Sequence, residues 1–238
     1  MILGAIREEG FTRISVRGED WDRPEVRRRV AQAGLAVIHV EDLLDPAVAR
    51  GVLAQPVRLR REFQARLAEA MGSLPESGVP SFSLDFDLSG IEHDGGRRAA
   101  LCALLREIGP ELFRRNLRLL LPVRIPAAAD VDVERIPGLL REAMSPHILL
   151  AAEIHPHECA REAAPMSWLR PIRFQAVLAR MEYDAEAGNR LTEALLRPWL
   201  AALAEMGLQD VCFRPHAEGL ERVFLELAGV RQVLARLS

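Results

Sequence analysis

The sequence contains no lysine, and all 31 of its basic residues are arginine. A lysine amine forms Schiff bases with carbonyl substrates, and the lysine of a P-loop binds nucleotide phosphates. Schiff-base aldolases, P-loop nucleotide hydrolases and enzymes with a lysine general base are therefore excluded. This exclusion holds whatever caused the arginine bias.

Cysteines and long apolar runs are also scarce. Cys102, Cys159 and Cys212 are far apart and form no CxxC pair, which argues against a disulfide framework and against a cysteine zinc site. No apolar stretch approaches the roughly 18 residues that a membrane-spanning helix needs. The N-terminal segment MILGAIREEG lacks the pattern of a signal peptide. We therefore expect a cytoplasmic protein that does not bind a membrane.

Charge and length further limit the kinds of protein that this chain can be. The formal net charge is −3, and acidic and basic residues are mixed along the chain. A protein that binds nucleic acid presents a basic stripe to the phosphates, so no nucleic-acid partner is expected. The 238 residues suit one barrel or two small domains. Because no linker rich in proline, glycine or serine divides the chain, we expect residues 1–238 to form a single domain.

Short runs typical of strands alternate with longer segments that have helical periodicity. Candidate strands are residues 12–17, 36–40, 81–87, 117–125, 148–155, 173–180 and 210–216, and candidate helices are residues 24–33, 59–71, 97–108, 133–144, 160–169, 191–206 and 220–237. Repeated strand–helix alternation predicts a parallel sheet covered by helices.

Polar residues end most of these strands, and this favours a TIM-type α/β barrel over an open, doubly wound sheet. A barrel gathers all strand ends around one pocket, whereas an open sheet gathers only those near its switch point. We expect seven or eight parallel strands. Residues 1–7 are predicted as an irregular strand or as a helix, with the usual first strand then absent.

The segment at residues 148–158, ILLAAEIHPHE, is the most informative in the chain. On an extended strand Glu153, His155 and His157 point the same way, because side chains alternate faces. Two histidines at this spacing can converge on one metal ion, with Glu153 as ligand or base. Pro156 interrupts the strand, so the prediction rests mainly on Glu153 and His155.

Asp85 and Asp87 also share one face of a predicted strand end. Paired carboxylates of this kind ligate Mg²⁺ or Mn²⁺, or acquire separated pKa values suited to acid–base catalysis. The alternative is a pair that caps a loop. His216 ends the last predicted strand and could supply a further metal ligand.

Four arginines lie at predicted strand ends. A guanidinium group presents a planar fork that binds carboxylates and phosphates, so these residues are candidates for substrate binding. Pairing with neighbouring acidic residues is the alternative. The four are Arg17, Arg124, Arg180 and Arg214.

Two segments resemble the early strands of the xylose-isomerase-like barrels, a superfamily that includes sugar phosphate isomerases/epimerases and endonuclease IV. Residues 9–16 read Glu-Gly-Phe-Thr-Arg-Ile-Ser-Val, and residues 33–40 read Ala-Gly-Leu-Ala-Val-Ile-His-Val. In that superfamily a helix ends in a Gly-aromatic pair before one strand, and a Gly-Leu-x-Val turn opens the next. The motifs span residues 9–87, and the order of elements matches over the whole chain.

The resemblance implies a divalent metal, Mn²⁺, Mg²⁺ or Zn²⁺, since the superfamily binds one through two glutamates, an aspartate and a histidine at strand ends. Glu153 with His155 fits one of these strands. Two other expected acids are replaced, by Pro-Val-Arg at residues 122–124 and by Arg-Pro-His at residues 214–216. The metal ligands available here are Glu153, His155, Asp87 and His216.

Two functions follow. The first is an enzyme similar to sugar isomerases/epimerases, in which Glu153 or Asp85 moves a proton next to a carbonyl group that a metal polarises. The second is a barrel without catalytic activity that binds a small anionic ligand through its arginines, or that serves as an assembly partner. The expected partner is a small carbohydrate or anionic substrate, with a homodimer as one option. DNA repair of the endonuclease IV kind ranks third.

Overall fold

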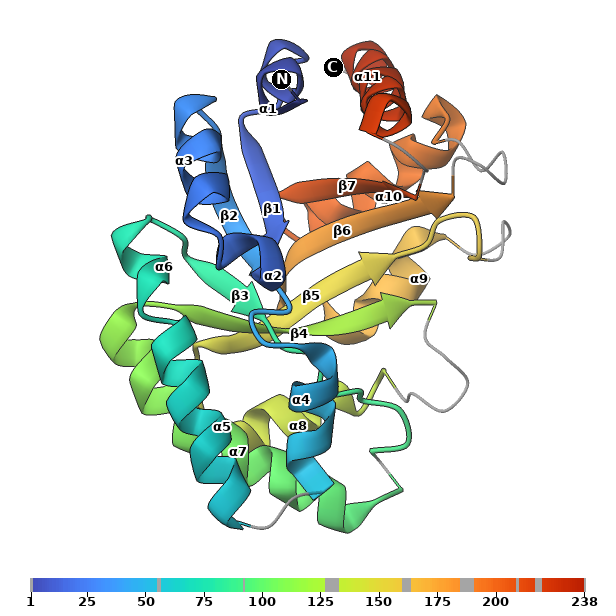
Figure 1. Ribbon diagram of the computed structural model, residues 1–238. Helices are drawn as coiled ribbons and strands as arrows, with labels where there is room; N and C mark the ends of the chain where they lie inside the picture. Colours follow the sequence, from blue (N-terminus) through green and yellow to red (C-terminus); the bar gives the residue numbers. More distant parts are fainter. Residues whose placement is uncertain are drawn as a thin grey trace.

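Seven parallel strands form one sheet in chain order, which curls into a nearly closed barrel (Figure 1). The computed structural model describes residues 2–54, 57–91, 93–126, 133–159, 164–184, 191–208, 210–216 and 220–237. The strands are β1 Arg13–Arg17, β2 Ala36–Glu41, β3 Ser81–Ser83, β4 Arg118–Ile125, β5 Ile148–Ile154, β6 Ala176–Asp184 and β7 Val211–His216. The predicted TIM-type barrel is thus confirmed, with β1 and β7 as its two edge strands.

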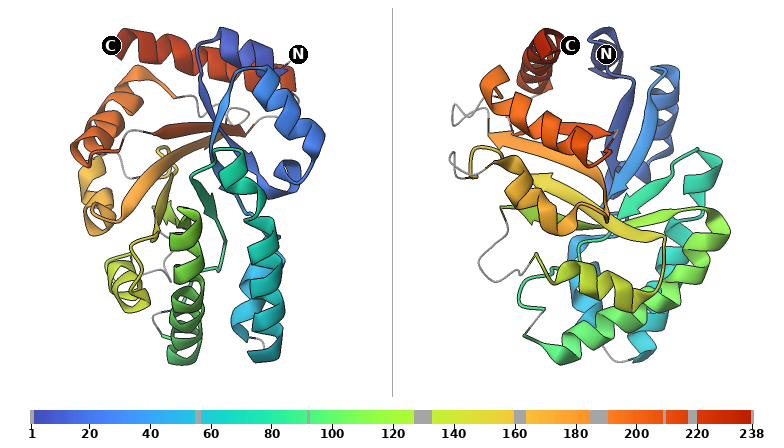
Figure 2. Two further views of the ribbon diagram at one scale, coloured as in Figure 1. Left: turned by 90° about the vertical axis from the view of Figure 1, so that its left-hand side faces the viewer. Right: turned by 180° about the vertical axis from the view of Figure 1, so that it is seen from behind.

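Helices cover the outside of the sheet (Figure 2). They are α1 Ile2–Glu8, α2 Gly18–Trp21, α3 Pro24–Gln32, α4 Pro46–Gly51, α5 Val57–Ala70, α6 Ser73–Glu76, α7 Gly95–Arg115, α8 Ile136–Ala143, α9 Pro165–Leu169, α10 Glu193–Glu205 and α11 Leu220–Leu237, with 3-10 turns η1 Val52–Ala54 and η2 Arg170–Ile172. The N-terminal segment is therefore a helix, and α1 contacts α11 at the other end of the chain. None of the helices described has the length and apolar character that crossing a membrane requires.

The two faces of the sheet bury different clusters, as β5 illustrates. Ile148, Leu150, Ala152 and Ile154 belong to the large core between sheet and helices. Ala151, between them, belongs to a small second cluster with Leu120 and Leu178 from the neighbouring strands. Alternation of side chains along the strand explains the division, and it places the small cluster inside the barrel. Glu153 continues this inward row.

Helix α7 runs further than its sequence pattern predicts. Asp94 caps its start by accepting a hydrogen bond from the backbone N–H of Arg97 at 2.9 Å. The prediction ended the helix at residue 108, but α7 continues through Pro110 to Arg115. A Cβ added at Gly109 would lie 3.2 Å from the Ser145 side chain, so the glycine permits this close packing. Part of another predicted helix, residues 160–163, lies outside the described residues.

Candidate active site at the barrel mouth

Arg180 on β6 is the centre of a buried charged cluster inside the barrel. Its Nη1 lies 2.8 Å from Glu41 Oε2, its Nε donates to Glu182 Oε1 at 2.6 Å, and its Nη2 donates to Glu153. Arg214 joins the cluster from β7, with Nη2 2.6 Å from Glu41 Oε2. We call these five residues the Arg180 cluster. Three carboxylates there share two guanidinium groups.

Strand register brings the cluster together. Glu153 on β5 lies opposite Arg180 on β6, and Glu182, two residues further along β6, lies opposite Arg214 on β7. Residues two apart on a strand share a face, so Arg180 and Glu182 both point into the barrel. Glu41 reaches the cluster from the end of β2. Three adjacent strands, β5, β6 and β7, and the more distant β2 therefore bring charged side chains together inside the barrel.

Glu41 is the most strongly held acid of the cluster. Its side chain is 7 % exposed, and its Oε1 accepts a hydrogen bond from the Ser15 hydroxyl at 2.8 Å. Burial alone would raise the pKa of Glu41, but Arg180, Arg214 and Ser15 outweigh burial, so its pKa lies below the usual range. Glu41 is thus a fixed negative charge that holds the two arginines in place.

Glu153 behaves in the opposite way. Burial, the largest effect, raises its pKa from the ordinary value of 4.5 to about 7. Arg180 opposes this increase, while the neighbouring carboxylates of Glu182, Glu41 and Asp42 reinforce it. The two guanidinium groups do not compensate three acids, and Glu153 carries the remaining imbalance. Its carboxyl group can therefore take up and release a proton near neutral pH.

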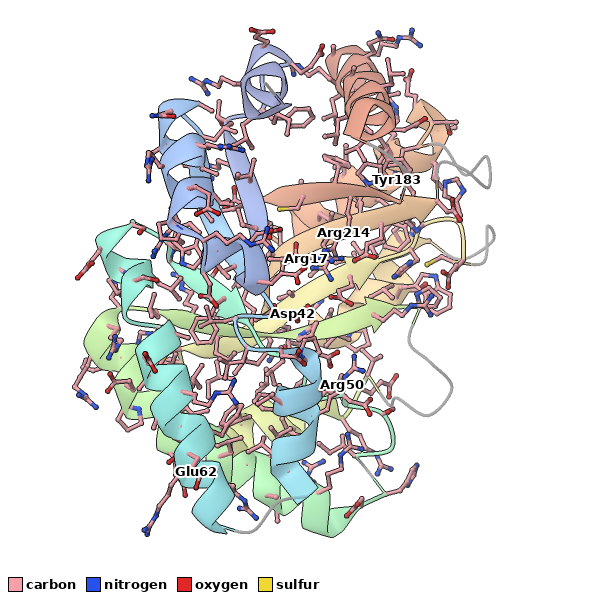
Figure 3. All side chains as sticks on the ribbon, in the orientation of Figure 1. Arg17, Asp42, Arg50, Glu62, Tyr183 and Arg214 are labelled. Carbon is pink, nitrogen blue, oxygen red and sulfur yellow. The ribbon has the colours of Figure 1, made fainter. Side chains whose placement is uncertain are left out.

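A cavity of about 410 Å³ opens at the carboxyl ends of the strands, and Glu153, Arg180, Glu182 and Arg214 line it. We call it the mouth cavity. Its rim adds charged side chains from segments after other strands, among them Asp42, directly after β2, and Arg50 on α4, which Figure 3 labels together with Arg214. Sites of TIM barrels lie at this end of the strands. The mouth cavity is large enough for a small ligand and is strongly polar.

Asp85 and Asp87 lie at the rim and not on a strand. Strand β3 ends at Ser83, four residues earlier than predicted, and Asp87 has a positive φ of 51°. Asp85 pairs with Arg50, and it accepts a hydrogen bond from the Asp87 backbone N–H at 2.8 Å. The Asx-type turn thus competes with the strand for these residues. Both aspartates line the mouth cavity from the loop that follows β3.

Asp87 is itself engaged by its neighbours. Burial acts to raise its pKa, but hydrogen bonds from Ser89 and the charge of Arg97 lower it below the usual range. Arg97 Nη2 lies 3.3 Å from Asp87 Oδ2. Asp87 is therefore ionised and paired with a cation from α7.

The remaining predicted residues lie around this centre. Arg124 lines the mouth cavity and pairs with Glu158 at 2.6 Å, and His155 Nδ1 lies 3.5 Å from the same glutamate. Arg17 is exposed at the end of β1, 3.7 Å from Glu19. The backbone of His216 ends β7 opposite Asp184, but its side chain lies outside the described part of the structure.

The described donors do not fit a divalent metal. Glu153 is bonded to Arg180 and Asp87 is paired with Arg97. Within the described ranges, no group of three or more histidine, cysteine, aspartate or glutamate side chains is arranged to hold a metal ion. A dication placed beside Glu153 would lie next to the guanidinium group of Arg180, which repels it. Metal binding by the ligands named from the sequence therefore stays an untested prediction.

Glu41 and Glu182 are the site residues that sequence reasoning missed. The strand prediction ended at residue 180 and placed Glu182 in a loop, whereas β6 runs from Ala176 to Asp184. Residue 175 instead closes a turn, in which the Gln175 backbone N–H donates to the Ile172 carbonyl at 3.0 Å. The spacing of two between Arg180 and Glu182 was the available signal, because it puts both on one face.

Solved structures of the same fold include D-psicose 3-epimerase from Clostridium cellulolyticum H10, with a TM-score of 0.70 and 11 % identity over 99 % of this chain and 91 % of that one. The 3-keto-D-glucoside 4-epimerase of E. coli matches with a TM-score of 0.69 and 16 % identity over 99 % and 92 %. An AP endonuclease of family 2 from Brucella melitensis matches at 0.68 and 13 % over 92 % and 88 %.

No protein-family model matches this sequence, and no curated protein matches it either. The likeness therefore lies in the fold, and it extends over nearly the whole chain. The resemblance that the early strand motifs indicated is confirmed at this level. The chain has the fold of the xylose-isomerase-like TIM barrels.

Proposed function

We propose that the mouth cavity binds a small sugar or sugar phosphate and that Glu153 transfers a proton at the carbon next to its carbonyl group. One observation carries the proposal: a carboxyl group with a pKa of about 7 lies on the cavity wall, bonded to a buried arginine. The epimerases that share this fold act on sugars, as their names state. The mouth cavity suits a polar ligand of that size.

The chemistry uses groups already in the Arg180 cluster. The ionised Glu153 takes the proton as the C–H bond breaks. The C–H electron pair forms a C=C bond, the carbonyl π electrons move to the oxygen, and the substrate becomes an enediolate. Arg180 and Arg214 supply positive charge near that oxygen, in a site with little solvent. Return of the proton to the neighbouring carbon, with the hydroxyl proton passing to the former carbonyl oxygen, gives an isomer. An epimer forms when a second acid protonates the opposite face of the same carbon.

Fixed guanidinium groups then supply the positive charge that a metal would otherwise provide. This role rests on the pairing of Glu153 and Glu41 with Arg180. The reaction we propose is therefore insensitive to a chelator.

A cytoplasmic location fits the three cysteines, all of which are free thiols.

The test is solvent exchange in D2O, followed by proton NMR, on a panel of ketoses, aldoses and their phosphates. We expect one substrate class to lose the proton next to its carbonyl, with and without EDTA. Glu153→Gln should abolish the exchange. Glu111→Gln, on α7 and away from the cavity, is the matched control and should leave the rate unchanged. Exchange that persists in Glu153→Gln would remove Glu153 as the base.

A second candidate is anion binding without turnover. It is favoured by the rim arginines Arg50 and Arg124, which line the mouth cavity with more than 40 % of their side-chain surface exposed, Arg50 at 55 % and Arg124 at 45 %. Titration calorimetry with the same panel separates the two. Saturable binding of sugar phosphates without deuterium exchange would favour the binding protein, and exchange would favour the enzyme.

A further inference from the structure

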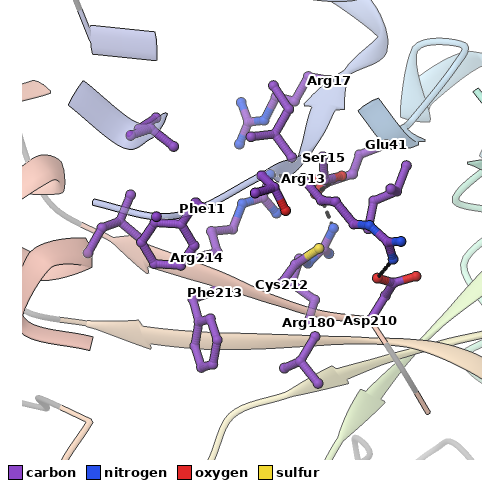
Figure 4. A pocket seen from close by; sticks show the side chains of 17 residues that line it. Phe11, Arg13, Ser15, Arg17, Glu41, Arg180, Asp210, Cys212, Phe213 and Arg214 are labelled. Carbon is purple, nitrogen blue, oxygen red and sulfur yellow. Dashed lines mark hydrogen bonds and ion pairs between the residues drawn. The ribbon is translucent and has the colours of Figure 1, made fainter. Parts of the chain in front are cut away.

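A second cavity, of about 400 Å³, lies between the edge strands β1 and β7. We call it the seam cavity. Its lining includes every residue from 10 to 15 and from 210 to 214, and Figure 4 shows side chains from both strands around it. Successive side chains of a strand point to opposite faces. An unbroken run of residues can border one cavity only if the cavity follows the edge of the strand.

Charged side chains, and not a backbone ladder, close the barrel at this seam. β1 pairs with β2 and β7 pairs with β6, and no ladder joins β1 to β7 in the described chain. Arg13 forms an ion pair with Asp210 at one end of the seam. Arg214 reaches across it from β7 to Glu41 on β2. TIM barrels have eight strands, and the described sheet has seven, so the seam lies where an eighth strand would pair with β1 and β7.

The walls of the seam cavity differ in character. Apolar side chains contributed by the terminal helices, Ile6 of α1 and Leu227 of α11, line it together with Phe11. Its charged lining consists of four arginines and two acids. These charged residues are Arg13, Arg17, Arg180, Arg214, Glu41 and Asp210. Arg180 and Arg214 are already paired with acids of the Arg180 cluster, and Arg13 with Asp210. Arg17 is exposed and among the described residues makes only a 3.7 Å contact with Glu19, so an incoming acidic side chain can meet Arg17.

We propose that the seam cavity is a docking site for an extended strand of a partner protein, which adds to the sheet between β1 and β7. Backbone groups on both edges would then complete two ladders, the usual basis of strand addition. Because a strand alternates its side chains, one row faces the apolar helices and the other row faces the barrel interior, on the side of Arg17. The partner segment therefore carries alternating apolar and acidic residues.

The sheet indicates the direction of this strand. Every described strand is parallel to its neighbours, so a docked strand parallel to β1 and β7 continues the arrangement. When the strand is joined ahead of α1 in a fusion, α1 becomes the crossover of a strand–helix–strand unit, and such units are parallel and right-handed in nearly all proteins.

The experiment uses the full chain and a fluorescent peptide of about eight residues, a usual strand length, with alternating valine and glutamate. Fluorescence anisotropy should detect saturable binding. A valine–lysine peptide should bind at least about tenfold more weakly, as should a valine–glutamate peptide N-methylated at alternate residues, since each loses charge or ladder contacts. Arg17→Glu, at an exposed arginine of β1, should also weaken binding about tenfold. Equal binding of the N-methylated peptide would overturn the proposal.

A covalent version makes the result independent of weak affinity. The valine–glutamate strand is joined to the N-terminus through a flexible linker, which gives a local concentration in the millimolar range. We expect its Tm to exceed that of the same fusion with a central proline, because proline cannot donate to a ladder. A Tm gain specific to the valine–glutamate fusion supports strand docking. Equal Tm values for the two fusions, with no binding of the free peptide, would overturn it.

Discussion

The β4–β5–β6 wall and the β7–β1 seam close the same barrel by different means. In the wall, β4 and β5 align over seven residue pairs, and the strands bury leucine, isoleucine and alanine on the outside. At the seam the described strands share no ladder, and the connections are Arg13 with Asp210 and Arg214 with Glu41. The wall thus depends on backbone and apolar contacts, and the seam on charge.

This difference explains where the candidate site lies. The strands around the seam supply Glu41, Arg180, Glu182 and Arg214, so the interior is most charged where the ladder is missing. The charged interior closes the barrel at the seam, and burial there, together with the neighbouring carboxylates, raises the pKa of Glu153. Substitutions that separate these two effects test whether the comparison is correct.

Removing Arg180 should produce the largest effect. In Arg180→Met, Glu41 and Glu182 keep Arg214 while Glu153 loses its ion pair, and an uncompensated buried charge typically costs about 3–5 kcal/mol. Urea denaturation at pH 7 measures the loss. Arg114→Met, at an exposed arginine of α7, is the control and should change stability by less than about 0.5 kcal/mol. A loss below about 1 kcal/mol in Arg180→Met would mean that the seam does not depend on the cluster.

The pH dependence of stability should come next in size. The pKa of folded Glu153, about 7, exceeds its ordinary value of 4.5, so the folded state keeps the proton to higher pH. The stabilisation is complete below about pH 4.5 and is lost as pH rises through about 7. Relative to Glu153→Gln, the parent should lose up to about 3 kcal/mol over this window. Parallel stability profiles, measured by urea denaturation at a series of pH values, would contradict this.

Apolar truncations compare the wall and the seam directly. Leu150 in β5 is 0 % exposed, and Leu150→Ala should lower the free energy of unfolding by about 2–5 kcal/mol. Ile14 on β1 is half-buried, and Ile14→Ala should lower the free energy of unfolding by about 1–2 kcal/mol less, because this side chain removes less apolar surface from water. Denaturant midpoints of Leu150→Ala and Ile14→Ala provide the comparison. Equal losses would show that the seam is packed as firmly as the wall.

The periodicity of apolar residues predicted the fold well where burial of apolar side chains alone decides the local structure. The apolar run at β5 and its inward Glu153 follow from alternation alone. The sequence also indicated that a usual first strand could be absent, and α1 occupies the N-terminal segment. These features depend on periodicity, which a sequence displays directly.

The candidate site was only partly predictable because it depends on which residues meet. Arg180 and Arg214 were candidates for binding a substrate, whereas in the structure they bind Glu41 and Glu182. Register between β6 and β7 places Arg214 opposite Glu182, closure of the barrel brings Glu41 of β2 to both arginines, and no local pattern encodes either. Asp85 and Asp87 looked like a strand pair, but their side chains cap a turn. Competition between a turn and a strand is decided by the surrounding fold.

That Glu153 exchanges a proton near neutral pH is tested most directly by measuring its pKa. Carbon-13 NMR of the side-chain carboxyl groups across the pH range gives this value. We expect one glutamate that titrates at about 7 and whose signal disappears in Glu153→Gln. A Glu153 pKa at or below the ordinary 4.5 would contradict this expectation, because the carboxyl group would then be fully compensated by Arg180 and could not exchange a proton at neutral pH.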